Sequence, residues 1–307
     1  MQSFGLPGGE RLNGAAASAT TLYTWGDSLR AWDLASGKSR LLAGSGGAPF
    51  ARAGCLYDGG FVLQQGDRLV WLAGRRKREL AREIETPDIL GVTLFGRRGV
   101  LIIQKHAQVR FYELPSSESR DIYSVYTPSR QAGLILHEVD GDGRPDFFCG
   151  NYWVRAPERF DLPWRLFAIN TWTETPDSGM VRLALLGVRV VACQAEMPRA
   201  RLSVFERPPD PRELWREAAL SSDLRYPRGL AVIDGEIAVA EDAGPGSRVL
   251  LYAETPRVLA TGGGLHTLVA CGAALVGIGV DSVTIWGRED RRRHPSASPH
   301  APGRTGP

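Results

Sequence analysis

The sequence of 307 residues has few cysteines and lacks long apolar runs. The four cysteines form no Cys-x-x-Cys pair and no cluster, so they indicate no disulfide framework; they are Cys55, Cys149, Cys193 and Cys271. No stretch approaches 18 uncharged apolar residues, so we expect no membrane span. The first residues, MQSFGLPGGERLNG, contain no apolar segment behind a basic one, so no signal peptide is visible.

A surplus of charge of one sign is also missing from most of the chain. The 37 lysines and arginines nearly balance 34 aspartates and glutamates, and the difference lies in residues 288–307. A balanced body lacks the basic face of a nucleic-acid-binding domain, so we expect no nucleic-acid partner. One dense basic run, GRRKREL at 74–80, has no interleaved aromatic residues for base stacking and is interpreted as a solvated turn between strands.

Motifs of common catalytic sites are absent as well. The chain has no Gly-x-Ser-x-Gly turn, no Gly-x4-Gly-Lys-Ser/Thr loop and no Gly-x-Gly-x-x-Gly segment that opens a helix. Its five histidines show none of the short spacings typical of metal ligands. An enzymatic function therefore has no motif in its support.

What the chain does contain is a repeated strand pattern. A four-residue pattern (apolar, any residue, apolar, aromatic) recurs at intervals of 34 to 55 residues, and only the unit at Trp71 departs from it, at its first position. The aromatic positions are Trp32, Trp71, Tyr112, Phe167, Phe205, Tyr252 and Trp286. Each follows a turn sequence and an upstream run of apolar residues with a period of two. Seven units of roughly 40 residues, each with about four short strands, are typical of a β-propeller.

We therefore predict an all-β fold, a single β-propeller of seven four-stranded blades. A β-sandwich is the alternative, but it has no reason to repeat one pattern at blade length. The propeller is placed at 20–287, after a partly flexible N-terminal segment at 1–19 and before a disordered, basic tail rich in Pro, Ser and Arg at 288–307. One stretch, PRELWREAAL at 211–220, is helix-like instead. We expect a monomer.

A calcium site is predicted in EVDGDGRPD, residues 138–146. The donors would be the carboxylates of Glu138, Asp140, Asp142 and Asp146 and the carbonyl of Arg144, because Ca²⁺ prefers oxygen ligands. An EF-hand is excluded, since the twelfth position from Glu138 is a cysteine and both flanks are strand-like. An acidic hairpin turn without a metal is the alternative.

Two known propeller repeats resemble parts of this chain. The segment Asp-x-Asp-Gly-x-x-Asp at 140–146 resembles the calcium loop of FG-GAP/VCBS repeats, with Glu138 in place of the usual first Asp. YPRGLAVIDGEIAVAEDAGPGSRVLLY, 226–252, resembles one NHL-type blade. The first resemblance implies a calcium ion between two strands of a blade. It also implies a location outside the cytoplasm, but no signal peptide is visible, so the sequence leaves the localisation open.

The segment at 150–179 makes the fourth unit the longest and is dense in aromatic and polar residues. We predict an exposed shelf that binds a polar ring compound, because stacking and planar hydrogen bonds suit such a ligand. Its binding residues would be Asn151, Tyr152, Trp153, Arg155, Trp164, Asn170 and Trp172. The alternative is that the tryptophans pack between neighbouring blades.

Two functions remain open from the sequence. The first is a calcium-stabilised propeller that acts as a binding module for a protein or glycan partner. The second is a propeller enzyme of the lyase, hydrolase or dehydratase type, acting on a carbohydrate-like substrate at the channel mouth. Its catalytic groups would come from four positions: His137, Arg228, Glu241 and His266. Propellers host both kinds of function, so the fold does not choose between them.

Overall fold

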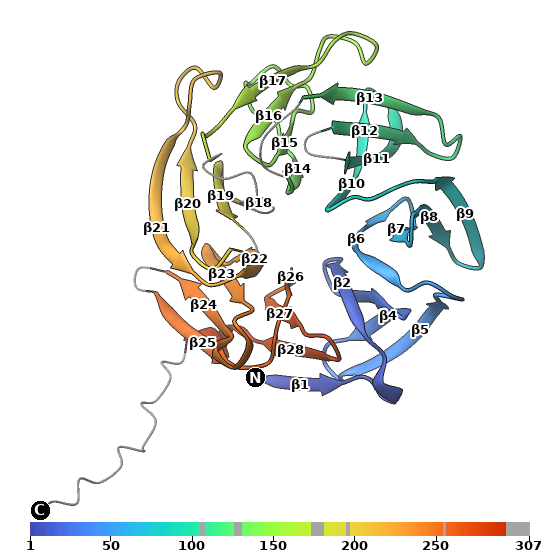
Figure 1. Ribbon diagram of the computed structural model, residues 1–307, viewed down its shortest axis with the longest axis vertical. Coiled ribbons are helices and arrows are strands. Elements are labelled where there is room, and N and C mark those ends of the chain that lie inside the picture. The colour runs from blue at the N-terminus through green and yellow to red at the C-terminus, as the bar shows by residue number, and fades with distance from the viewer. Residues whose placement is uncertain (105–107, 126–130, 173–180, 195–196, 254–255, 293–307) are drawn as a thin grey trace, which may run out of the picture.

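The computed structural model describes residues 1–104, 108–125, 131–172, 181–194, 197–253 and 256–292. The chain forms seven four-stranded antiparallel sheets around a central axis, which confirms the predicted single propeller (Figure 1). In each blade the first strand lies nearest the axis and the fourth lies at the rim.

The first three blades follow one another along the chain. Blade 1 contains β2 (Leu12–Ala17), β3 (Leu22–Gly26), β4 (Ser28–Asp33) and β5 (Lys38–Gly44). Blade 2 contains β6 (Phe50–Tyr57), β7 (Gly60–Gln65), β8 (Arg68–Ala73) and β9 (Arg76–Ala81). Blade 3 contains β10 (Ile89–Leu94), β11 (Arg97–Gln104), β12 (Gln108–Glu113) and β13 (Ser119–Ser124).

The next three blades repeat this order. Blade 4 contains β14 (Leu134–Leu136), β15 (Phe147–Cys149), β16 (Tyr152–Arg155) and β17 (Arg165–Ala168). Blade 5 contains β18 (Val181–Leu186), β19 (Arg189–Gln194), β20 (Ala200–Glu206) and β21 (Arg216–Leu224). Blade 6 contains β22 (Pro227–Ile233), β23 (Glu236–Glu241), β24 (Arg248–Tyr252) and β25 (Arg257–Thr261).

Blade 7 is built from both ends of the propeller. Its inner strands are β26 (Thr267–Cys271), β27 (Ala274–Ile278) and β28 (Ser282–Trp286), and its outer strand is β1 (Gln2–Gly5). β1 pairs antiparallel with β28, with Gln2 opposite Ile285 and Gly5 opposite Ser282 (Figure 1). The ring therefore begins inside the segment 1–19 that the sequence placed ahead of it. The short, small-residue strands QSFG and LNGAAA carry too few large apolar residues to show a period of two.

Tight Asp-Gly turns join strands within blades. Asp58 and Gly59 link β6 to β7 with φ of 54° and 68°, and Asp234 and Gly235 link β22 to β23 with φ of 50° and 80°. Positive φ at both central residues suits the twist of a two-residue hairpin. The first and third turns of every blade lie on one face of the ring, because successive strands are antiparallel.

The apolar core is divided among the spaces between neighbouring blades. In the described residues, each of seven apolar clusters combines side chains of two adjacent blades, including one that joins blade 7 to blade 1. The aromatic residue of the repeated pattern lies on the third strand in six blades. In blade 4 the pattern is shifted, because Phe167 lies on the fourth strand, β17.

The helix-like stretch at 211–220 is not a helix. Its second half, 216–220, belongs to β21, which pairs with β20 and exposes Arg216, Glu217 and Leu220 to solvent. Pairing with a neighbouring strand overrides the helix preference of its alanine, glutamate and leucine residues, since sheet propensity depends strongly on context.

The predicted tail at 288–307 is partly ordered. Arg288–Arg292 form the short helix α1, and residues 293–307 lie outside the described residues. The Arg291 side chain is buried and its Nη2 donates to Asp234 Oδ2 at 2.7 Å and to the Ala273 carbonyl at 3.3 Å. The ion pair joins α1 to blade 6, and the hydrogen bond to Ala273 joins it to blade 7. No helix in the described part of the chain is long and apolar enough to cross a membrane.

We predict that Arg291→Met lowers the free energy of unfolding by about 2 kcal/mol, because a part-buried hydrogen bond between charged groups and the bond to the Ala273 carbonyl are lost. Arg288→Met is the matched control: Arg288 is exposed and only 3.7 Å from the same carboxylate, so its change should stay within about 0.5 kcal/mol. Denaturant unfolding measures both variants. Equal effects of the two changes would contradict a specific role of Arg291.

Candidate metal centre

The acidic loop connects β14 to β15 on the face that carries the first and third turns. Its two glycines, Gly141 and Gly143, have φ of 84° and 77°, which residues with a Cβ rarely adopt. These two positions let the chain turn sharply, so that carboxylates from both sides of the loop point inward.

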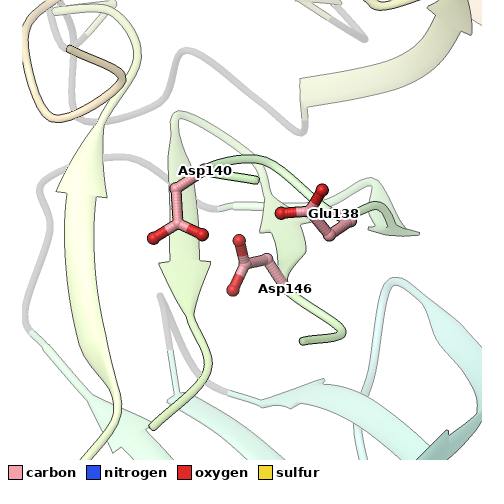
Figure 2. Close-up of side chains that lie close together, drawn as sticks. All are labelled: Glu138, Asp140 and Asp146. Carbon is pink, nitrogen blue, oxygen red and sulfur yellow. The ribbon is translucent and has the colours of Figure 1, made fainter. Parts of the chain in front are cut away.

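Three of the predicted ligands come together in the loop. Carboxylate oxygens of Glu138, Asp140 and Asp146 lie within 4.8 Å of one another (Figure 2). Asp146 is fully buried, the Asp140 side chain is 12% exposed and Glu138 is at the surface. A hard cation between these oxygens would have solvent on one side and the blade on the other.

Asp146 anchors the loop to its blade. Its Oδ2 accepts the Val139 amide at 3.1 Å and its Oδ1 accepts the Ala156 amide at 2.7 Å. Burial raises the pKa of Asp146 to about 6; the two amides oppose this rise, and the charges of Asp140 and Asp142 add to it. Within the described residues Asp146 forms no ion pair with a basic side chain. The carboxylate thus lacks a direct cationic partner, and the oxygen-only donor set fits Ca²⁺.

Of the other two predicted ligands, Asp142 lies outside the cluster of three carboxylates. Asp142 forms ion pairs with Arg144 and Arg155, and Arg155 also pairs with Asp140. Burial works to raise the pKa of Asp142, but the amide and charge of Arg144 and the hydrogen bond from Arg155 hold it below its usual value. The Arg144 carbonyl accepts the Asp146 amide at 3.0 Å. Asp142 is therefore not one of the three clustered carboxylates, because it pairs with the arginines beside it. The Arg144 carbonyl as a metal ligand stays a prediction.

The three tryptophans of the predicted shelf lie in the core. Trp153, Trp164 and Trp172 are 0%, 8% and 2% exposed. Trp164 packs between blades 3 and 4, and the other two pack between blades 4 and 5. The prediction of an exposed aromatic shelf is wrong for these residues, since buried rings offer no face to a ligand; residues 173–179 of the segment lie outside the described residues.

The polar residues of the same segment hold the chain in place. Asn151 Nδ2 donates to the Trp172 carbonyl at 2.9 Å, and Asn170 Oδ1 accepts the Trp172 amide at 3.0 Å. Both asparagines are buried, and Tyr152 is partly buried. Arg155 belongs to the acidic loop through its ion pairs. The described part of this segment, 150–172, therefore serves packing and support of the loop.

We predict that Trp153→Ala lowers the free energy of unfolding by about 3–5 kcal/mol, because it empties a large space between two blades. Trp153 stacks on Phe167 with ring centroids 4.9 Å apart, and its Nε1 donates to the Pro211 carbonyl at 2.9 Å. Leu214→Ala is the control, since Leu214 is 57% exposed, and should change stability by less than about 0.5 kcal/mol. A small loss for Trp153→Ala in thermal or denaturant unfolding would contradict the packing role.

The four residues proposed for a channel enzyme each have separate partners. Glu241 is buried, accepts the Arg225 amide at 2.9 Å and pairs with Arg248, whereas Arg228 pairs with Asp242 at 3.2 Å. His137 stacks on Phe148. Among the described side chains, no hydrogen bond or ion pair joins any two of the four.

His266 is held as a neutral ring at the inner end of blade 7. Its Nε2 donates to the Leu12 carbonyl at 3.1 Å, so Nδ1 accepts from Thr267 Oγ1 at 3.0 Å. Burial lowers its pKa, and the nearby charge of Arg52 lowers it further. Arg52, on β6, reaches across the axis and donates to the carbonyls of Arg228 and His266. Sequence reasoning missed Arg52, because a lone arginine in an inner strand has no distinguishing motif.

We predict that His266 makes the protein acid-sensitive. Below the ordinary His pKa of about 6.5, the unfolded chain takes up a proton that the folded ring refuses, so stability falls as pH drops below about 7. His266→Gln keeps a donor near the Leu12 carbonyl and removes this titration. Between about pH 7.5 and 5.5, the free energy of unfolding should therefore fall less in the His266→Gln variant than in the wild type. The same loss in both proteins would contradict the assignment.

Comparison with known proteins supports the fold. No protein-family model and no curated protein sequence matches the chain. Among solved structures, YCF48 from Cyanidioschyzon merolae matches with 11% identity and a TM-score of 0.62, over 94% of this chain and 98% of that chain. A chain of a mitotic checkpoint complex matches with 11% identity and a TM-score of 0.63, over 93% and 94%. BamB from Moraxella catarrhalis matches with 14% identity and a TM-score of 0.53, over 94% and 98%.

The TM-scores show a shared propeller fold, and at such low sequence identity the likeness shows nothing beyond the fold. The FG-GAP/VCBS and NHL resemblances stay predictions.

Proposed function

We propose that the protein is an interaction module for another protein, with a calcium ion bound in the loop at 138–146. The observation that carries the calcium part is the convergence of three carboxylates, one of them fully buried and without a basic partner among the described residues. The rigid ring below the loop supports the interaction part. Seven packed blades present their turns on two faces, and such turns are common positions for binding residues.

A protein is the partner that we favour over a glycan. The three tryptophans that would stack on sugar rings are buried, which removes the feature that suggested a glycan. One of the matched propellers is part of a mitotic checkpoint complex and so assembles with other proteins. We extend that property to this chain as a proposal on the basis of the shared fold.

Calcium binding must compete with Arg155 for Asp140. Arg155 pairs with both Asp140 and Asp142, and its side chain is 34% exposed. A cation between Glu138, Asp140 and Asp146 would take over the neutralisation of Asp140 and leave Arg155 with Asp142. The arginine thus stabilises the metal-free loop and lowers its affinity for the ion.

We predict that millimolar calcium raises the melting temperature of chelator-treated protein by a few degrees. Calcium at about 100 times its Kd contributes roughly 2.7 kcal/mol, and the shift is small for a chain of this length. Magnesium should have a much smaller effect, because it prefers a tighter octahedral shell. Asp140→Asn should remove most of the shift. Glu158→Gln is the control: Glu158 is an exposed residue of the same blade and its change should leave the shift intact.

Calorimetric titration measures binding directly in the same samples. An unchanged melting temperature together with no heat of calcium binding would overturn the metal site.

We also predict that Arg155→Gln increases the calcium-dependent shift. The variant loses the charge that balances Asp140 and Asp142, so its metal-free form should be less stable and its calcium affinity higher. Thermal unfolding with and without calcium measures both effects. A shift equal to or smaller than that of the wild type would contradict competition between the arginine and the ion.

A further inference from the structure

A basic groove lies between blades 2 and 3, on the same face as the acidic loop. Its cavity has a volume of about 730 Å³, within the range of ligand pockets in proteins. The lining residues are Asp58, Trp71, Arg76, Lys77, Arg78, Arg98, Leu114 and Pro115. They come from the outer strands of blade 2, from the start of β11 and from turns of both blades.

Positive charge dominates this groove. Three of its side chains, Arg76, Arg78 and Arg98, are cationic, and the one carboxylate of the lining, Asp58, pairs with Arg98. The Lys77 side chain lies on the opposite face of blade 2, since Lys77 pairs with Leu72, and its Nζ donates to Gln65 Oε1 at 2.6 Å there. Arg76 is exposed and, within the described residues, its side chain forms no hydrogen bond or ion pair. The groove therefore holds cationic charge that its own carboxylate does not balance.

An apolar floor adjoins these charges. Trp71 lies opposite Arg78 in the pairing of β8 with β9, so both side chains are on the face of blade 2 that packs toward blade 3. Leu114 and Pro115 approach from the third turn of blade 3. A ligand with negative charges around one apolar group would match this combination of cations and apolar surface.

The groove also borders an unpaired strand edge. β9 is the last strand in the order β6-β7-β8-β9, so its outer edge has backbone groups without partners in the sheet. Such an edge can pair with an extended segment of another chain. The run at 74–80, which the sequence analysis interpreted as a turn, lies largely in this strand, with Arg76, Lys77 and Arg78 exposed along it.

We propose that this groove binds an extended acidic segment of a partner protein, with carboxylates facing Arg76 and Arg78 and one apolar side chain on Trp71. This inference rests on the proposed role as an interaction module and gives it a location. A nucleic acid fits less well, because Trp71 is the only aromatic side chain of the lining and base stacking uses several.

The test uses the full chain and a short fluorescein-labelled peptide in which aspartates and glutamates surround one leucine. Fluorescence anisotropy should show saturable binding that weakens as sodium chloride rises from about 0.05 to 0.5 M. Arg76→Glu/Arg78→Glu should weaken binding by about tenfold or more, since two attractions become repulsions. Arg76→Ala should weaken it by a smaller factor. A peptide with glutamine in place of the acidic residues should not bind.

Lys38→Glu/Arg40→Glu is the matched control. These exposed residues alternate on β5, the outer strand of blade 1, and the double change alters net charge by the same amount. The control should bind the peptide within about twofold of the wild type. Melting curves of all variants verify that the ring remains folded.

Three results would overturn the proposal that this groove binds an acidic segment. These are no saturable binding by the wild type, equal weakening in the control, or preferential binding of a polyuridine oligonucleotide that is lost with Arg76 and Arg78. Stronger weakening in the control than in the groove variant would place acidic docking on blade 1 and leave the proposed interaction role standing. The calcium titration of the same wild-type sample tests the other part of the proposed function independently of peptide binding.

Discussion

The pairing of β1 with β28 closes the ring, and the packing of every blade depends on that closure. A single four-stranded sheet has two apolar faces, and here each face is buried only by the blade beside it. The cluster between blades 7 and 1 combines Trp32 with Val276 and Ile285, so the last blade completes the core of the first. An open ring would leave these faces to solvent. Closure thus turns small sheets into one rigid support.

That support explains how short loops can hold precise positions. The acidic loop begins and ends on strands of blade 4, and Asp146 ties it to the amides of Val139 and Ala156. On the same face, the basic groove uses side chains of two blades whose spacing is set by the core between them. Both features are therefore held by the packing of the blades.

Much of the fold was predictable from the repeated pattern, whereas the details that depend on distant contacts were not. Seven aromatic residues at blade-length intervals predicted seven blades, because each blade repeats the same burial of its middle strands. β1 was missed, since only its pairing with β28, nearly 280 residues away, makes QSFG a strand. The tryptophans of the fourth unit were assigned to a shelf because composition does not distinguish a stacking surface from a core.

In the acidic loop, too, the local sequence predicts some features and contacts with other parts of the blade decide the rest. The spacing of the acidic residues predicted Glu138, Asp140 and Asp146 as ligands, and in the structure the carboxylates of these three lie close together. Asp142 was grouped with them because its position in the motif is correct. Its diversion to Arg144 and Arg155 depends on how β16 returns beside the loop, which the local sequence does not reveal.

Hydrogen exchange measured by mass spectrometry, with calcium and with chelator, tests the central claim most directly. Calcium held by Asp146 and its neighbours should slow exchange of the amides of Val139 and Ala156, which both donate to that carboxylate. The effect should be confined to the loop and the adjoining strands of blade 4, while β1 and β28 exchange at unchanged rates. Equal exchange across residues 137–157 with and without calcium would contradict a metal-supported loop on a preformed ring.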